Sequence, residues 1–131
     1  MTIDKGGDIV YTIDDINDML DAIADELPEE VFRELNGGVC LYPETKRSEA
    51  DPYGRLFTLG EYRHDQMGRY IVIYYGSVCA VHGGAQPEEM RASLKKVLTH
   101  ELTHHLESLS GERDLEIEDA RYIAEFLGNY P

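Results

Sequence analysis

Three residues in the last third of the chain have the types and spacing of a hydrolytic metal site. His100, Glu101 and His104 form the pattern H-E-x-x-H inside the sequence VLTHELTHH. On a helix, side chains four residues apart lie one turn apart on the same face, so both imidazoles can bind one Zn²⁺ ion. Glu101 follows the first histidine directly, where its carboxylate can accept a proton from a water molecule beside the metal. The pattern therefore predicts a zinc site with Glu101 as general base.

A single long helix is expected to carry these residues. Pro87 and the two glutamates after it are typical of a helix start, and Gly111 is typical of a helix end. Apolar residues recur between them at helical spacing, at Met90, Leu94, Leu98, Leu102, Leu106 and Leu109. The histidine face therefore borders a buried face. Two surface histidines in register by chance are the alternative, and the glutamate between them argues against it.

A catalytic zinc site needs a third protein ligand, and the longer metzincin pattern does not supply it. H-E-x-x-H-x-x-G-x-x-H would require glycine at Glu107 and histidine at Ser110. The helix instead continues to Gly111, seven residues after His104. If the chain reverses there into a helix predicted over 115–127, acidic residues return level with His104.

Three acidic residues in this returning segment are candidates for the third ligand. Glu116 ranks first because it aligns with apolar residues of the last helix, and a carboxylate on such a face is costly unless paired or bound to metal. Asp119 is an alternative, either as the ligand or as the group that orients a ligating imidazole. Asp114 is a further alternative. Ordinary acidic residues favoured by the helix dipole are the competing interpretation of all three.

Other histidines and tyrosines are weaker candidates. His105 points about a quarter turn away from His104 and is expected to pack or to face solvent rather than to bind metal. Zinc peptidases often use a tyrosine or histidine to stabilise the oxyanion. Tyr74 and Tyr75 are the nearest candidates for that role, although packing in the core is the more ordinary function of each.

The remaining pattern predicts an α+β fold in one domain over 1–131. Helices are expected over 14–26 and 28–35, and the stretch 76–86 is expected to be a connection. Strands are expected over 39–42, 56–62 and 70–75. They would form a short mixed sheet beside the long helix, with 70–75 as an exposed edge to which a peptide adds as a strand.

Composition limits the classes of partner. The chain has 12 basic and 26 acidic residues, a formal net charge of −14, which argues against nucleic acid or an anionic membrane as partner. Apolar runs are too short to span a bilayer, and the polar N-terminus lacks the features of a signal peptide. A cytoplasmic protein is therefore expected, and the sequence does not indicate its oligomeric state.

The chain resembles the small bacterial zincin-like metallopeptidases. The resemblance rests on an acidic first helix followed by LPEEVFREL, on the strand YIVIYYG, and on H-E-x-x-H-H within VLTHELTHHLE. It implies a minimal zincin-like fold with a C-terminal helix, zinc bound by His100 and His104, and Glu101 as catalytic base. Commoner members show H-E-x-x-H-H-F-G with an acidic ligand three residues later. Here five residues separate His105 from Gly111, and strict transfer selects Asp114 rather than Glu116.

These patterns predict zinc-dependent hydrolysis of peptide bonds, with a peptide or a flexible protein as substrate. The alternative is a metal-binding zincin-like interaction module without significant hydrolytic activity. A metal-free protein, in which the histidine pair is accidental, is the third hypothesis.

Overall fold

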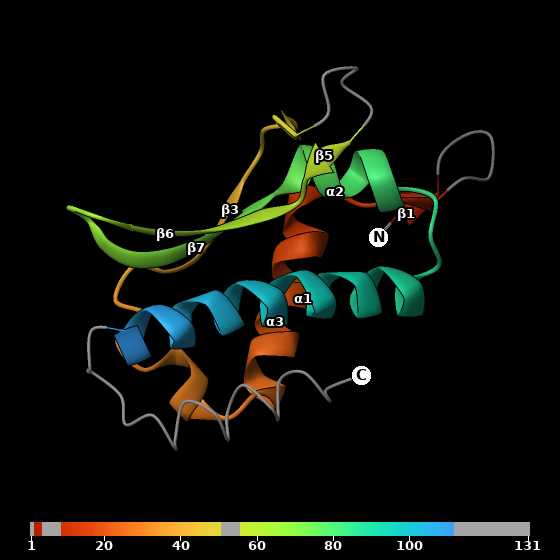
Figure 1. The fold of residues 1–131 in the computed structure, drawn as a ribbon. Helices are drawn as coiled ribbons and strands as arrows, with labels where there is room; N and C mark the ends of the chain where they lie inside the picture. The colour runs from red at the N-terminus through yellow and green to blue at the C-terminus, as the bar shows by residue number, and fades with distance from the viewer. Residues whose placement is uncertain (1, 4–8, 51–55, 112–131) are drawn as a thin grey trace.

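The computed structural model describes residues 2–3, 9–50 and 56–111 (Figure 1). Its helices are α1 (Ile13–Glu26), the 3₁₀ helix η1 (Glu29–Phe32), α2 (Tyr75–His82) and α3 (Pro87–Gly111). Its strands are β1 (Thr2–Ile3), β2 (Ile9–Val10), β3 (Gly38–Tyr42), β4 (Lys46–Arg47), β5 (Phe57–Thr58), β6 (Gly60–Asp65) and β7 (Gly68–Tyr74). The helix predicted over 115–127 lies outside the described residues, as do Glu116, Asp119 and Asp114.

The central sheet is short and mixed, as predicted, and the described chain has an α+β fold. Its strand order is β3-β7-β6, with β3 parallel and β6 antiparallel to β7. The prediction that 70–75 forms a sheet edge is wrong, because β7 pairs on both sides. This strand is apolar on both faces, as expected of a central strand. In the part of the chain that the structure describes, β6 is an edge.

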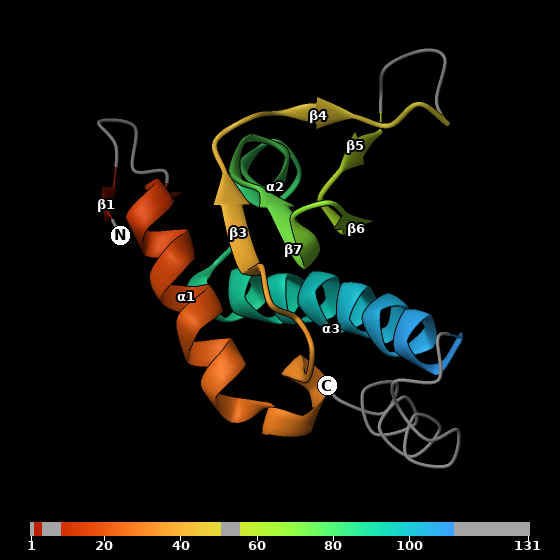
Figure 2. The same cartoon turned by 90° about the vertical axis from the view of Figure 1, so that its left-hand side faces the viewer.

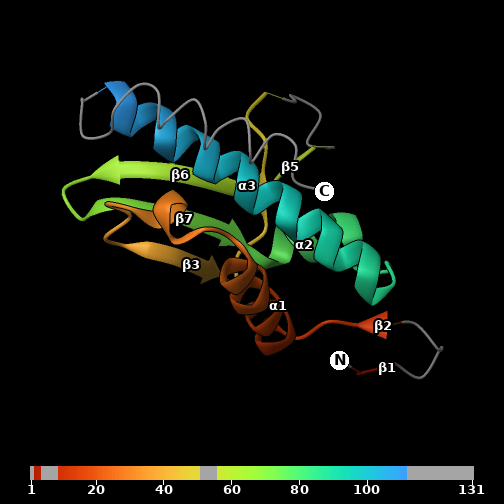
Figure 3. The same cartoon turned by 90° about the horizontal axis from the view of Figure 1, so that it is seen from below.

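Helices α1 and α3 cover one face of this sheet (Figures 2 and 3). Helix α1 begins where predicted, with a capping box in which Thr12 and Asp15 bond each other's backbone N–H groups. The predicted apolar stripe of α3 is buried from Met90 to Leu109 and packs with Ile71 and Ile73 of β7. This packing fixes which face of α3 meets the core and which remains open.

The stretch 76–86 is not only a connection, because α2 begins directly after β7. Gly76 lies so close to the chain before β4 that a Cβ atom there would lie 2.1 Å from Thr45 Oγ1. The Gly76 N–H also donates to the Glu44 carbonyl at 3.0 Å, and the Lys46 N–H donates to Ser77 Oγ at 2.8 Å. These tertiary contacts hold a short helix that the local sequence does not predict.

Gly60 allows the edge strand to approach the long helix. The strand predicted over 56–62 divides at Leu59 into β5 and β6, so that β6 begins at Gly60. A Cβ atom at Gly60 would lie 2.8 Å from Val97 Cγ1 of α3 and 3.1 Å from Ile73 Cδ1. Glycine at this position therefore brings the edge of the sheet against the helix that carries the histidine pair.

In the described ranges, no helix is both long enough and apolar enough to cross a bilayer.

Candidate metal centre

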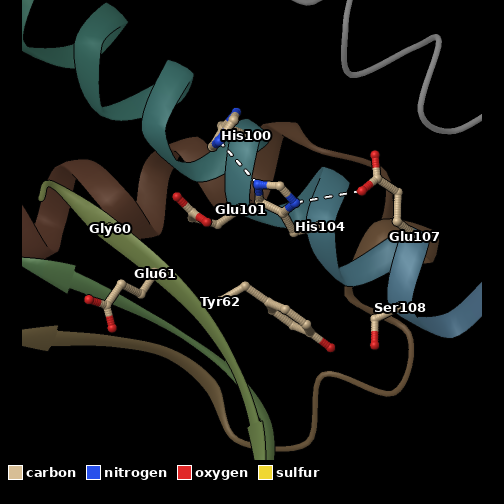
Figure 4. A pocket seen from close by; sticks show the side chains of 8 residues that line it. All are labelled: Gly60, Glu61, Tyr62, His100, Glu101, His104, Glu107 and Ser108. Carbon is tan, nitrogen blue, oxygen red and sulfur yellow. Dashed lines mark hydrogen bonds and ion pairs between the residues drawn. The ribbon is translucent and has the colours of Figure 1, made fainter. Parts of the chain in front are cut away.

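The structure brings the three residues of the H-E-x-x-H pattern together on the open face of α3 (Figure 4). Ligand atoms of His100, Glu101 and His104 all lie within 4.8 Å of one another. The Nε2 atoms of the two histidines face each other at 3.2 Å. Two nitrogen ligands at the usual Zn–N length in a tetrahedral site lie about 3.3 Å apart. The two imidazoles thus have the spacing of a zinc-binding pair before any ion is added.

The second ring nitrogen of His104 also has a suitable neighbour. Its Nδ1 lies 3.6 Å from Glu107 Oε2, one turn further along α3. Metal-binding histidines usually direct the nitrogen that does not bind the ion at a carboxylate or carbonyl, which fixes the tautomer and the ring orientation. A small side-chain rotation brings Glu107 within hydrogen-bond distance of His104. The donor set of imidazole nitrogens beside carboxylates fits Zn²⁺.

Glu101 is buried although both histidines beside it are exposed. Only 7% of its surface is accessible, and this burial raises the pKa of its carboxyl group. The charges of His100 and His104 and a hydrogen bond from the Tyr62 backbone N–H act in the opposite direction on that pKa. A carboxylate with a raised pKa is a stronger base. The Glu101 carboxylate lies where α3 meets β6.

A groove between β6 and α3 exposes this cluster to solvent. Its volume is about 830 Å³, and its lining comprises Gly60, Glu61, Tyr62, His100, Glu101, His104, Glu107 and Ser108. The Glu61 side chain points away from the groove (Figure 4), toward Lys46 and Arg63. A second hollow of about 380 Å³ adjoins it and is also lined by Gly60, His100 and Glu101.

Tyr62 forms part of the groove wall and is held by a buried polar network. The Tyr62 hydroxyl lies 2.9 Å from His105 Nδ1, and Arg69 Nη1 donates to the same hydroxyl at 3.1 Å. His105 Nε2 lies 2.6 Å from the Arg33 carbonyl oxygen, which can only accept. His105 therefore donates through Nε2 and accepts the Tyr62 proton at Nδ1. Arg69 also donates to Ser108 Oγ at 2.6 Å, so the network ties the sheet to α3.

The environment of His105 agrees with the sequence prediction that it is not a ligand. Its side chain is fully buried, and burial lowers the pKa of its imidazole. Both ring nitrogens have protein partners, so the imidazole is packed and has no nitrogen left for a metal ion. His104, one position earlier, is exposed and lies with His100.

Tyr74 and Tyr75 do not line the groove, and their positions agree with packing, the more ordinary function expected of each. Tyr74 lies on the opposite face of the sheet, where its hydroxyl accepts from Arg63 Nη2 at 2.7 Å. The Tyr75 hydroxyl donates to the Tyr11 carbonyl. Tyr62 is the tyrosine that lines the groove. Alternation along β6 places Tyr62 and Gly60 on one face, but only pairing with β7 determines that this face meets α3.

Comparison with known proteins gives a match among solved structures. No family model matches the chain, and no curated protein matches it. Among solved structures, a conserved hypothetical protein from Thermo thermophilus is similar, with a TM-score of 0.65 and 32% sequence identity. The match covers 77% of this chain and 99% of that chain. The name of that protein states no activity.

Proposed function

The chain belongs to the same family as this conserved hypothetical protein, and from the geometry of its own groove we propose that it is a zinc metallopeptidase with a zincin-like fold. The observation that carries the proposal is the 3.2 Å separation of the His100 and His104 Nε2 atoms, with the Glu101 carboxylate in the same cluster. Glu116 is the proposed third ligand, with Asp119 and Asp114 as alternatives.

The surroundings of the histidine pair favour a catalytic site over a structural one. Structural zinc sites are closed by four protein ligands, whereas catalytic sites keep one position open. Here the side chain of His104 is 49% exposed, and the pair opens into the groove. When bound, Zn²⁺ supplies activation of a water molecule and polarisation of the scissile carbonyl group.

The chain's own residues handle the proton and hold the substrate. Glu101 accepts the proton of the attacking water and passes it to the leaving amine. Burial and the Tyr62 backbone N–H keep its carboxylate in place for this transfer. His105 and Arg69 hold the Tyr62 side chain, and with it the width of the groove beside Glu101.

Strand β6 is the proposed edge to which an extended peptide adds. The Leu59 carbonyl accepts from the Tyr74 N–H at 2.9 Å, so Leu59 faces β7. Because backbone groups alternate in direction along a strand, Gly60 and Tyr62 direct theirs toward the groove, where the Tyr62 N–H already donates to Glu101 and the other groups face an incoming peptide. A peptide or a flexible protein segment can add main-chain hydrogen bonds at such an edge. The open groove, without deep walls, favours these substrates over folded ones.

Replacement of Glu101 by glutamine tests the mechanism. The Glu101→Gln protein should retain stoichiometric zinc by elemental analysis but hydrolyse peptides from a mixed library at least about 100-fold more slowly, because it lacks the general base. Glu88→Gln, a change at an exposed position in the first turn of α3, is the matched control and should behave as wild type.

Other outcomes separate the alternatives. Equal turnover by the Glu101→Gln and wild-type proteins contradicts the role of Glu101. Stoichiometric zinc with no chelator-sensitive cleavage by the wild-type protein favours the interaction module. Absence of zinc from protein prepared in zinc-containing medium contradicts both.

A further inference from the structure

We propose that the groove binds peptides antiparallel to β6, with basic residues on the N-terminal side toward Glu107, acidic residues on the C-terminal side toward Lys96, and an apolar side chain beside Leu59 and Val97. This inference rests on the proposed function, because it names the substrate class of the same groove. It concerns Lys96, which the hydrolytic mechanism does not use, and Glu107, whose carboxylate also lies 3.6 Å from His104 Nδ1.

The two hollows beside the histidine pair share part of their lining, and β6 runs from the Lys96 side, which Leu59 lines, to the Glu107 side, which Tyr62 lines. Both are lined by Gly60, His100 and Glu101, so they meet at the proposed site of cleavage. One arm extends to Glu107 and Ser108, and the other extends to Lys96. A peptide lying along β6 therefore passes the metal-binding residues and enters both arms.

The charged residues at the ends of this groove lie on one face of α3. Lys96, His100, His104 and Glu107 follow one another at intervals of four, four and three residues. Eleven residues of helix separate Lys96 from Glu107, a rise of roughly 16 Å. An extended peptide covers that length with about five residues. The groove thus presents a cation at one end and an anion at the other, at a spacing that one short peptide can span.

Among the described residues, neighbouring charges do not cancel this polarity. Arg69 lies near the Glu107 end, but it is buried and donates to Tyr62 and Ser108. Glu61 points away from the groove, and its carboxylate is paired with Lys46 and Arg63 on the other face of the sheet. Lys96 and Glu107 are both exposed and can meet an incoming side chain directly.

The arm at the Lys96 end has the composition of a pocket for an apolar side chain. Its lining comprises Thr58, Leu59, Gly60, Lys96, Val97, His100 and Glu101. Leu59 and Val97 are the aliphatic members, and Gly60 adds no side chain to the wall. An apolar residue on the acidic side of the cleaved bond is therefore expected to fill it.

Two peptides of identical composition test the direction. The first is acetyl-Lys-Lys-Ala-Ala-Phe-Glu-Glu-amide, and the second is its charge mirror, acetyl-Glu-Glu-Ala-Ala-Phe-Lys-Lys-amide. Binding is measured by calorimetry on the zinc-loaded full chain with Glu101→Gln, which leaves the peptides intact. The first peptide should bind roughly three- to thirty-fold more tightly at low salt, the range expected for two exposed ion pairs. This preference should shrink at 1 M NaCl, where exposed charges are screened.

A charge reversal at Lys96 supplies the second arm of the test, because it leaves Glu107 beside His104 intact. In the Glu101→Gln background, Lys96→Glu should abolish the preference, because both ends of the groove then carry the same charge. Glu88→Lys, at an exposed position outside the groove lining, changes the net charge and should leave the preference unchanged. Equal affinity of the Glu101→Gln protein for the two peptides at low salt, or an undiminished preference in the Lys96→Glu variant, overturns the proposal.

Turnover by the protein with Glu101 intact separates the two proposals. If it cleaves neither peptide while the Glu101→Gln protein retains directional binding, hydrolysis is wrong and the direction of binding stands. If it cleaves both peptides equally and the Glu101→Gln protein binds them equally, the direction is wrong and hydrolysis stands.

Discussion

His104 and His105 are adjacent in sequence and occupy opposite environments. The side chain of His104 is 49% exposed and lies beside His100, whereas His105 is fully buried between Tyr62 and the Arg33 carbonyl. One step along a helix turns the side chain by about 100°, enough to move it from the groove to the core. The difference shows that two faces of α3 have different roles. The groove face carries reactive groups at little cost in packing, and the core face carries the stability that keeps them in place.

The largest expected effect comes from breaking the core face next to the metal centre. Leu102 is fully buried, and Leu102→Ala should lower the free energy of unfolding by about 2–5 kcal/mol because it leaves a cavity. Urea denaturation of the metal-free protein measures this loss. Zinc affinity of the protein that remains folded should stay close to wild type, since the ligand atoms lie on the other face. A large loss of affinity without a loss of stability would contradict the division between the two faces.

Removal of a histidine from the groove face should lower zinc affinity and leave the free energy of unfolding nearly unchanged. His104→Ala should weaken zinc binding by more than about 100-fold, since removing a group that merely orients a ligand already costs about 10–100-fold. The free energy of unfolding of the metal-free protein should change by less than about 0.5 kcal/mol, as is usual for exposed positions. Competition with a chromophoric chelator measures the affinity. Unchanged zinc binding would exclude His104 as a ligand.

The smallest expected effect concerns the response of the core face to pH. Burial lowers the pKa of His105 in the folded protein, so the unfolded chain binds a proton first as pH falls below about 6.5. The stability contributed by neutral His105 is therefore present above that pH and is lost as pH falls toward the folded pKa. The slope reaches at most about 1.4 kcal/mol per pH unit.

Comparison with a residue that does not titrate isolates this contribution. Metal-free wild-type and His105→Gln proteins are denatured in urea between about pH 7.5 and pH 5, a range that spans the ordinary histidine pKa. The difference between their free energies of unfolding should shift in favour of the variant as pH falls. A difference that does not change with pH would mean that His105 titrates alike in both states.

Much of the described fold was predictable because local signals agree with tertiary packing. The helix predicted over 14–26 forms as α1, capped by Thr12 and Asp15, and α3 runs from Pro87 to Gly111 with its apolar stripe buried. The spacing of His100 and His104 by itself predicts one shared face, because helix geometry is local. Their 3.2 Å separation follows from the same geometry.

Predictions failed where the outcome depends on distant partners. The stretch 70–75 has the pattern of a strand whether it is central or at an edge, and only the positions of β3 and β6 decide. Tyr74 and Tyr75, the candidates for stabilising the oxyanion, face away from the groove. Helix α2 has little amphipathic pattern, and its start is held by contacts with the segment before β4.

The sequence by itself determined the chemistry that α3 presents, since the types and spacing of His100, Glu101 and His104 act within one helical turn. Only the tertiary structure decided what surrounds that chemistry. The close approach at Gly60 brings β6 beside α3, buries Glu101 and makes Tyr62 a wall of the groove. The physical reason is the distance along the chain over which each property is determined. Helical periodicity is set by neighbours along the chain, whereas burial, pKa and groove shape are set by the packing of residues that are distant in sequence.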